Sequence, residues 1–288
     1  MKVSVFTVMC PDLDLQETID VCKASGADGI EWRVREIPPD RRGGDYSFWG
    51  NHKNDLPPAK FVETAEDIRK RCDDAGLAIP NIASYVGYAS DADEVKMVAE
   101  GAAKCGAASF RCGPARYDGS RAFDELYRET VEGYERIVEI IRPFGVKALI
   151  ETHPDIITPS ASAARRIVEN FSSTEVGVIH DPGNMVNEGY EQWKMGFEIL
   201  GDYLSLVHAK NASRVAYERR EDGIVPWGGK SVPLGDGGAD WRAIVDALKA
   251  VGYEGFLSLE DFTTDVSSAE KIERDVKFLK EVIAAAGA

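Results

Sequence analysis

The sequence lacks the marks of several protein classes. No apolar run approaches the roughly 18 residues that a membrane-spanning helix needs, and the start, MKVSVF, lacks the apolar core and cleavage site of a secretory signal peptide. The first strand-like run ends in VMCPDLD, without a GxGxxG segment or a P-loop. We therefore expect a cytoplasmic protein that has no membrane partner and no nucleotide-binding loop.

Cysteine, histidine and positive charge are also scarce. The five cysteines form no CxxC pair, which indicates reduced, buried thiols rather than a zinc knuckle or a disulfide scaffold. The formal net charge is -15, and an acidic surface repels phosphate backbones. These counts argue against a nucleic-acid partner.

What the chain does have is a regular alternation of two patterns. Short apolar, β-branched runs, expected to be strands, lie at 3–10, 29–34, 78–84, 108–113, 147–153, 176–181, 204–210 and 256–260. Amphipathic segments, expected to be helices, lie near 14–25, 60–75, 92–105, 120–142, 160–170, 189–201, 240–251 and 268–285. Strict alternation favours parallel strands joined by crossover helices.

Eight such units in 288 residues predict an α/β protein with a single (β/α)8 TIM barrel as its one domain, residues 1–288. The competing fold is an open, doubly wound sheet, which commonly has fewer strands. Two connections are unusually long, 36–58 and 211–240, and both follow strands, on the face where barrel active sites form. They are candidate lids or substrate walls, and oligomer contacts are the alternative.

The ends of the last four predicted strands carry groups that can bind metal or transfer protons. The residues are Glu151 and His153, His180 and Asp181, His208 and Lys210, and Glu260 and Asp261. In a barrel these ends converge on one axis, where clustered carboxylates would repel one another unless a cation lay among them. His180 and Asp181 must point to opposite sides of their strand. Asp181 is nearer the tip, so we expect it to face the axis and His180 to pack outward or form a hydrogen bond.

A set of two glutamates, one aspartate and one histidine offers three hard oxygens and one nitrogen. This mixture suits Mn²⁺, which we expect first, and also Mg²⁺ or Co²⁺, with Zn²⁺ possible. The predicted cofactor is therefore one divalent metal ion.

Five segments, in this order, resemble the xylose-isomerase-like barrels, and in particular their sugar isomerase/epimerase branch, which includes tagatose 3-epimerase, hydroxypyruvate isomerase and inosose dehydratase. The segments are LIETHP, VGVIHDPGN, LVHAKN, PLGDGGADW and GYEGFLSLED. The resemblance runs over nearly the whole chain. It implies that Glu151, Asp181, His208 and Glu260 bind the metal, and that substrate oxygens complete the coordination.

The substrate shell departs from the resemblance. The epimerases have a second glutamate where this chain has Ile157 and a histidine where it has Asn184, whereas their arginine is matched by Arg214. Residues expected near the barrel mouth from the strand ends and long loops are Glu31, Arg33, Arg111, Trp49, His52 and Trp227. For Glu31, Arg33 and Arg111 a ring of salt bridges that closes the barrel is an equal alternative. The predicted substrate contacts are Glu31, Arg33, Asn184, Arg214 and Trp227.

The expected reaction is isomerisation or epimerisation of a sugar or a related polyol ketone, by proton transfer next to a metal-polarised carbonyl. Glu151 and Glu260 are the expected acid and base, and His153 is a proton shuttle, a substrate hydrogen-bond donor or a brace. A lyase or dehydratase acting on an inosose or a 3-oxo-glycoside is the alternative, because an enolate beside a leaving group eliminates it. An apurinic endonuclease is disfavoured, because it needs more histidines and a basic DNA-binding face. A non-catalytic subunit that pairs with an enzyme is a further alternative. The expected partner is a small carbohydrate, with self-association into a homo-oligomer possible.

Overall fold

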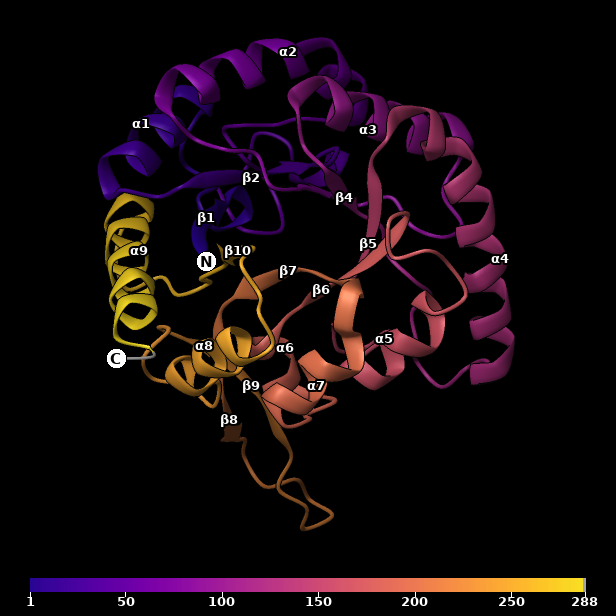
Figure 1. Ribbon diagram of the computed structural model, residues 1–288. Coiled ribbons are helices and arrows are strands. Elements are labelled where there is room, and N and C mark those ends of the chain that lie inside the picture. The colour runs from indigo at the N-terminus through magenta and orange to yellow at the C-terminus, as the bar shows by residue number, and fades with distance from the viewer. Residues whose placement is uncertain (287–288) are drawn as a thin grey trace.

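The computed structural model describes residues 1–286, and its eight parallel strands close into a ring (Figure 1). The strands are β1 (Lys2–Phe6), β2 (Gly29–Val34), β3 (Ile82–Ser84), β4 (Ser109–Arg111), β5 (Lys147–Glu151), β6 (Val176–His180), β7 (Leu204–Ala209) and β10 (Phe256–Leu259). Around the ring their order is β1-β10-β7-β6-β5-β4-β3-β2. An open sheet would have two free edges, so the closed ring confirms the predicted barrel.

Helices surround the ring, as Figure 1 shows. They are α1 (Leu15–Ser25), α2 (Pro58–Ala75), α3 (Ala92–Cys105), α4 (Phe123–Ile141), α5 (Ala161–Val168), α7 (Trp193–Leu200), α8 (Trp241–Ala250) and α9 (Ser268–Ala285). Each lies within a few residues of its predicted range. Gly26, Gly76 and Gly106 end α1, α2 and α3 with φ of 78°, 77° and 78°, a left-handed conformation that costs glycine little. Among residues 1–286, no helix has both the length and the apolar character that crossing a bilayer requires.

Several strands are shorter than predicted, and for β3 and β1 the reason is local. β3 begins at Ile82 rather than at 78, because Pro80 has no N–H to give to a sheet ladder. β1 ends at Phe6, and the next residues form a 3-10 turn, Thr7–Met9. There the hydroxyl of Thr7 accepts the amide N–H of Arg33 at 2.8 Å, in place of a backbone carbonyl.

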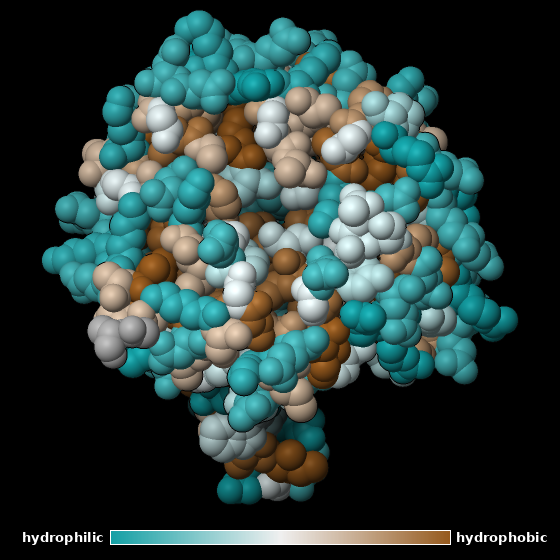
Figure 2. Space-filling model, in the orientation of Figure 1, coloured by the Kyte–Doolittle hydropathy of each residue, from teal (hydrophilic) through white to brown (hydrophobic). Residues whose placement is uncertain are grey.

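Three elements were not predicted. The short helix α6 (Pro182–Asn187) follows β6 directly. The long connection 211–240 contains an antiparallel hairpin of β8 (Asn211–Ala216) and β9 (Trp227–Val232), which projects from the barrel in Figure 1. Ile224, between these strands, is 54% exposed, and Figure 2 shows apolar side chains on the projecting part.

The barrel interior has an apolar floor and a polar layer above it. Leu149, Ile179 and Leu206 pack together as a buried cluster on β5, β6 and β7. Side chains two residues apart on a strand share one face, so the next inward positions toward the strand ends are those of Glu151, Asp181 and His208. The same periodicity that fills the barrel therefore carries these polar groups to its mouth.

His180 packs outward, as alternation predicted. Its ring lies 4.7 Å from that of Phe197 in α7, and the side chain is fully buried. Neither ring nitrogen has a hydrogen-bond partner among the described residues, and burial lowers the pKa of His180 to about 3. The imidazole is therefore neutral when the protein is folded and must gain a proton on unfolding in mild acid.

We predict that His180→Leu flattens the acid dependence of stability. Between about pH 6.5 and 3 the unfolded chain binds one more proton at this position, so wild-type stability falls as the pH falls through that window. Urea unfolding at pH 7 and about pH 5 should show that the variant loses about 2 kcal/mol less than wild type over this interval. Equal losses in the two proteins would contradict the assignment of a neutral, unpartnered imidazole.

Candidate functional site

Four side chains from four strands meet at the barrel mouth. Glu151, Asp181, His208 and Glu260 are all buried, and one ligand atom from each lies within 4.8 Å of the other three. Glu151 ends β5, Asp181 follows β6, His208 lies in β7, and Glu260 follows β10. The structure thus brings together the four residues that the sequence singled out. Three carboxylates and one imidazole around a common point could hold one divalent cation.

The imidazole of His208 is oriented from below by Glu31. Nε2 of His208 lies 3.2 Å from a carboxylate oxygen of Glu31. A carboxylate only accepts, so Nε2 directs a proton at Glu31, and Nδ1 is the ring nitrogen that faces the cluster. Nδ1 lies 3.2 Å from Glu151 and 3.8 Å from Asp181. This carboxylate–histidine pair is the arrangement that fixes the tautomer of metal-binding histidines.

Glu31 is itself held firmly. It is fully buried and accepts hydrogen bonds from Asn81 at 2.7 Å and from Ser258. The sequence left two roles open for Glu31: a residue at the barrel mouth, or a member of a ring of salt bridges that closes the barrel. The structure places Glu31 beneath the cavity, where it pairs with His208.

The pKa shifts show a site that attracts positive charge. Burial raises the pKa of Asp181 to about 7, against the lowering effect of Lys210, and the charge of Glu260 adds to the rise. Burial would lower the pKa of His208, but the carboxylates of Glu31 and Glu151 raise it well above its usual value. Crowded carboxylates thus favour any cation within reach.

Two basic side chains and one amide offset this negative charge. Lys210 lies 2.8 Å from Asp181 and also pairs with Glu260. Arg111 pairs with Glu151 at 2.7 Å, and burial would raise the pKa of that carboxyl, but His208 and Arg111 hold it well below its usual value. The amide of Asn184 donates to Asp181 at 2.9 Å and to Glu151 at 3.2 Å.

Asp181 is positioned by the turn HDPGN. Its side chain caps α6 by accepting the N–H of Asn184 at 2.9 Å, and its own N–H donates to the hydroxyl of Thr152 at 2.8 Å. Pro182 starts the helix, where proline has no N–H to lose. A Cβ on Gly183 would lie 2.8 Å from the carbonyl oxygen of Lys210. Only glycine therefore lets α6 approach the end of β7 this closely.

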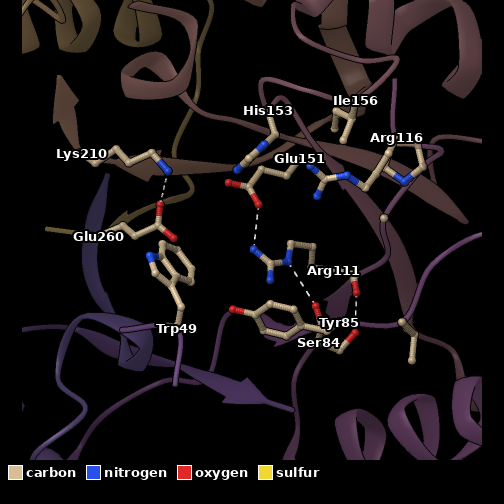
Figure 3. A pocket seen from close by; sticks show the side chains of 13 residues that line it. Trp49, Ser84, Tyr85, Arg111, Arg116, Glu151, His153, Ile156, Lys210 and Glu260 are labelled. Atoms are coloured by element: carbon tan, nitrogen blue, oxygen red, sulfur yellow. Dashed lines mark hydrogen bonds and ion pairs between the residues drawn. The ribbon is translucent and has the colours of Figure 1, made fainter. Parts of the chain in front are cut away.

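A cavity of about 240 Å³ opens next to the cluster (Figure 3). Its wall includes the carboxylates of Glu151 and Glu260 and the ring of His153, together with Trp49 from the long connection 36–58. The remaining lining residues are Ser84, Tyr85, Val86, Arg111, Gly113, Pro114, Arg116, Ile156 and Lys210. The sequence named Lys210 among the polar groups at the strand ends without giving it a role in the site, and it did not single out Tyr85 or Arg116.

Other predicted contacts lie away from the cavity wall. Arg214 is exposed in β8 and donates to the carbonyl of Asn187, and Trp227, in β9, is 58% exposed. Neither is among the residues that line the cavity. A substrate contact for these two residues stays a prediction. His52 is buried beneath its own loop, where its Nε2 lies 3.1 Å from the carbonyl of Phe48.

Comparisons with known proteins find one matching family and several relatives. A family model described as "Xylose isomerase-like TIM barrel" matches residues 19–282. An inosose dehydratase of Geobacillus thermodenitrificans (strain NG80-2) is 25% identical over 146 residues, which is 48% of this chain and 47% of that protein, so the match spans about half of the relative.

Two solved structures share the fold over nearly their whole length. The IOLI protein with a bound zinc atom has a TM-score of 0.75 at 17% identity, covering 99% of this chain and 98% of that one. The 3-keto-D-glucoside 4-epimerase from E. coli has a TM-score of 0.72 at 17% identity, covering 98% and 99%. At these identities the likeness is one of fold.

We predict that Gly183→Ala destabilises the protein by about 1–3 kcal/mol, because the added methyl group meets the backbone of Lys210. Urea unfolding measures the change. Gly44→Ala is the matched control, since the nearest atom to its added methyl group is 3.6 Å away. An equal effect of the two substitutions would show that α6 does not depend on this close approach.

We predict that Glu31→Gln weakens divalent-metal binding by about tenfold to a hundredfold, because the amide removes the negative charge beneath His208 and one of the two acceptor oxygens that serve His208, Asn81 and Ser258. Isothermal titration of the metal-free protein with Mn²⁺ measures the affinity. Asp155→Asn, an exposed change in the loop after β5, should leave it unaltered. Unchanged affinity in Glu31→Gln would remove Glu31 from the account of the site.

Proposed function

The chain belongs to the xylose isomerase-like TIM barrel family, and we propose that it is a divalent-metal-dependent isomerase or epimerase of a sugar or a related polyol ketone. The observation that carries the proposal is the buried cluster of Glu151, Asp181, His208 and Glu260, which opens on a cavity of about 240 Å³. Two of its carboxylates, Glu151 and Glu260, also line that cavity. A group bound there would meet both.

These four residues would hold the metal, with Mn²⁺ as the proposed ion and Mg²⁺, Co²⁺ or Zn²⁺ as alternatives. Their buried oxygens and nitrogen fit a divalent ion, which would neutralise the repulsion among the carboxylates. When bound, the ion supplies Lewis-acid chemistry: it polarises a substrate carbonyl and favours negative charge on its oxygen.

Glu260 is the proposed base. Its side chain accepts a hydrogen bond from Lys210, the one such bond it makes among residues 1–286. It therefore makes fewer hydrogen bonds than Glu151 and is freer to accept a proton. Glu260 takes a proton from the carbon next to the carbonyl, and the ion pair with Lys210 holds its carboxylate in place at the cavity wall. Arg111 and Asn184 hold both oxygens of Glu151. This carboxyl rests ionised, so it first takes a proton from solvent or from a substrate hydroxyl and then delivers it to the carbon.

His153 is the proposed hydrogen-bond partner of a substrate hydroxyl. Its Nδ1 lies 2.6 Å from the carbonyl of Pro154, and a carbonyl only accepts, so Nδ1 carries the proton. In the neutral ring Nε2 is then an acceptor. Because His153 lines the cavity beside Glu151, Nε2 can take a hydrogen bond or a proton from the substrate (Figure 3).

A lyase is the second candidate, supported by the similarity to an inosose dehydratase. The first step would be the same proton abstraction, and loss of a hydroxyl from the neighbouring carbon would replace reprotonation. The second glutamate of the epimerases is absent: Ile157 stands in its place and is buried, and Ile156 lines the cavity. Arg214 and Trp227 remain proposed contacts for the far end of a substrate, and self-association remains a prediction.

We predict that the Mn²⁺-loaded protein exchanges solvent deuterium into the carbon beside the carbonyl of a substrate. The panel contains free ketoses, their 6-phosphate and uronate derivatives, inososes and 3-oxo-glycosides, and NMR in D₂O reads both exchange and product. A product isomeric with the substrate identifies an isomerase or epimerase, whereas loss of water identifies a lyase.

Glu260→Gln should slow this exchange by about a hundredfold to ten-thousandfold, the usual contribution of a general base. Glu254→Gln, an exposed change in the turn before β10, is the control and should exchange at the wild-type rate. Undiminished exchange in Glu260→Gln, or no exchange with any member of the panel, would contradict the proposed chemistry.

A further inference from the structure

Three arginines surround the ring of Tyr85 at the barrel mouth. The guanidinium carbons of Arg35, Arg111 and Arg33 lie 4.6, 4.7 and 5.6 Å from the centre of that ring. Arg33 comes from β2, Arg35 follows it, and Arg111 ends β4. Three cations around one aromatic ring repel one another, and the face of the ring offsets only part of this repulsion.

The arginines differ in how their charges are compensated. Arg111 pairs with Glu151 at 2.7 Å. Arg33 is only 3% exposed, yet its Nε and Nη2 have no hydrogen-bond partner among residues 1–286. Burial lowers the pKa of Arg33, and Tyr85 opposes this shift more strongly than Asp55, which forms no ion pair with Arg33. A buried guanidinium with free donors is costly unless an anion reaches it.

A fourth arginine extends this positive region along the cavity. Arg116 is exposed and lines the same cavity as Tyr85 and Arg111. In Figure 3 it lies on the far side of Glu151 from Lys210 and Glu260. We call Arg33, Arg35, Arg116 and the ring of Tyr85 the arginine wall. No ion pair within the described part of the chain includes any of its three arginines.

The arginine wall is unusual in this protein. The chain carries a formal net charge of -15, so uncompensated positive charge is scarce on it. Of the arginine wall, Tyr85 and Arg116 line the cavity whose other end holds Glu151 and Glu260, and Arg33 and Arg35 lie against the ring of Tyr85 without lining the cavity themselves. Guanidinium groups bind carboxylate and phosphate oxygens through paired, charge-assisted hydrogen bonds. A neutral sugar would leave these donors unused.

We propose that the substrate carries an anionic group, a carboxylate or a phosphate, which binds the arginine wall while the carbonyl end faces Glu151 and Glu260. This inference rests on the proposed function and narrows its substrate to a sugar acid or a sugar phosphate. The local wall overrides the repulsion that the net charge of the whole chain exerts on an anion.

The test compares three ligands that differ only at one end: D-fructose, D-fructuronate and D-fructose 6-phosphate. Isothermal titration of the full, Mn²⁺-loaded chain measures their affinities. At least one of the two anionic ligands should bind about tenfold to a hundredfold more tightly than fructose, and its affinity should fall as NaCl is added. The tighter of the two identifies the anionic group as carboxylate or phosphate.

Arg33→Met and Arg116→Gln should each reduce the preference for the anionic ligand by about tenfold or more. Arg116 is exposed, so its substitution tests the proposal even if Arg33→Met fails to fold, which circular dichroism detects. Arg142→Gln, an exposed change in the turn before β5, is the matched control and should keep the full preference.

Equal binding of the three ligands, a preference that survives both arginine substitutions, or no binding of either anion at about 10 mM would each overturn the proposal. These are equilibrium measurements that need no turnover. An anion preference without deuterium exchange would contradict the proposed reaction alone, and exchange of neutral ketones without an anion preference would contradict the arginine wall alone.

Discussion

Buried carboxylates that share one small volume repel one another, and the mouth of this barrel is organised around that repulsion. Glu151, Asp181 and Glu260 converge there with His208, and Glu31 lies directly beneath. Three neighbours are turned toward them: Lys210 contacts two of the carboxylates, Arg111 a third, and the amide of Asn184 two. These contacts offset part of the charge, and a divalent ion would offset the rest. The proposed chemistry follows from the same constraint, since the groups that bind the ion also line the cavity.

The fold delivers these groups through a simple repeat. In a strand every second side chain faces inward, so an apolar residue in the floor of the barrel is followed two positions later by a polar residue at the mouth. Leu149 precedes Glu151, and Leu206 precedes His208, in this way. Closing the ring then brings residues more than a hundred positions apart within 4.8 Å. The short helix α6 adds the last constraint, because it requires Asp181 as its cap.

The barrel and the four residues of the cluster could be predicted because their signals are local. Helix and strand periodicity defined eight units, and the polar residues at strand ends identified which positions would converge. What could not be predicted depends on contacts between segments distant in sequence. Glu31 looked like a residue of the mouth, and its role beneath His208 is set by the register of β1, β2 and β10. Tyr85 follows an ordinary strand end, and only the arginines of β2 and β4 make it notable. The hairpin of β8 and β9 was read as a loop, because glycines and prolines dominate the stretch that contains β9.

The cavity is therefore asymmetric: the carboxylates of Glu151 and Glu260 line one part of it, and Tyr85 and Arg116 of the arginine wall line another. Such a separation of charge orients a substrate before any bond changes.

The proposed site and chemistry both require that one divalent ion binds among the four residues, and anomalous diffraction from a crystal grown with Mn²⁺ tests this most directly. The account predicts a single strong manganese peak bounded by Glu151, Asp181, His208 and Glu260. A fully occupied peak elsewhere, or none in this cluster at saturating Mn²⁺, would contradict it.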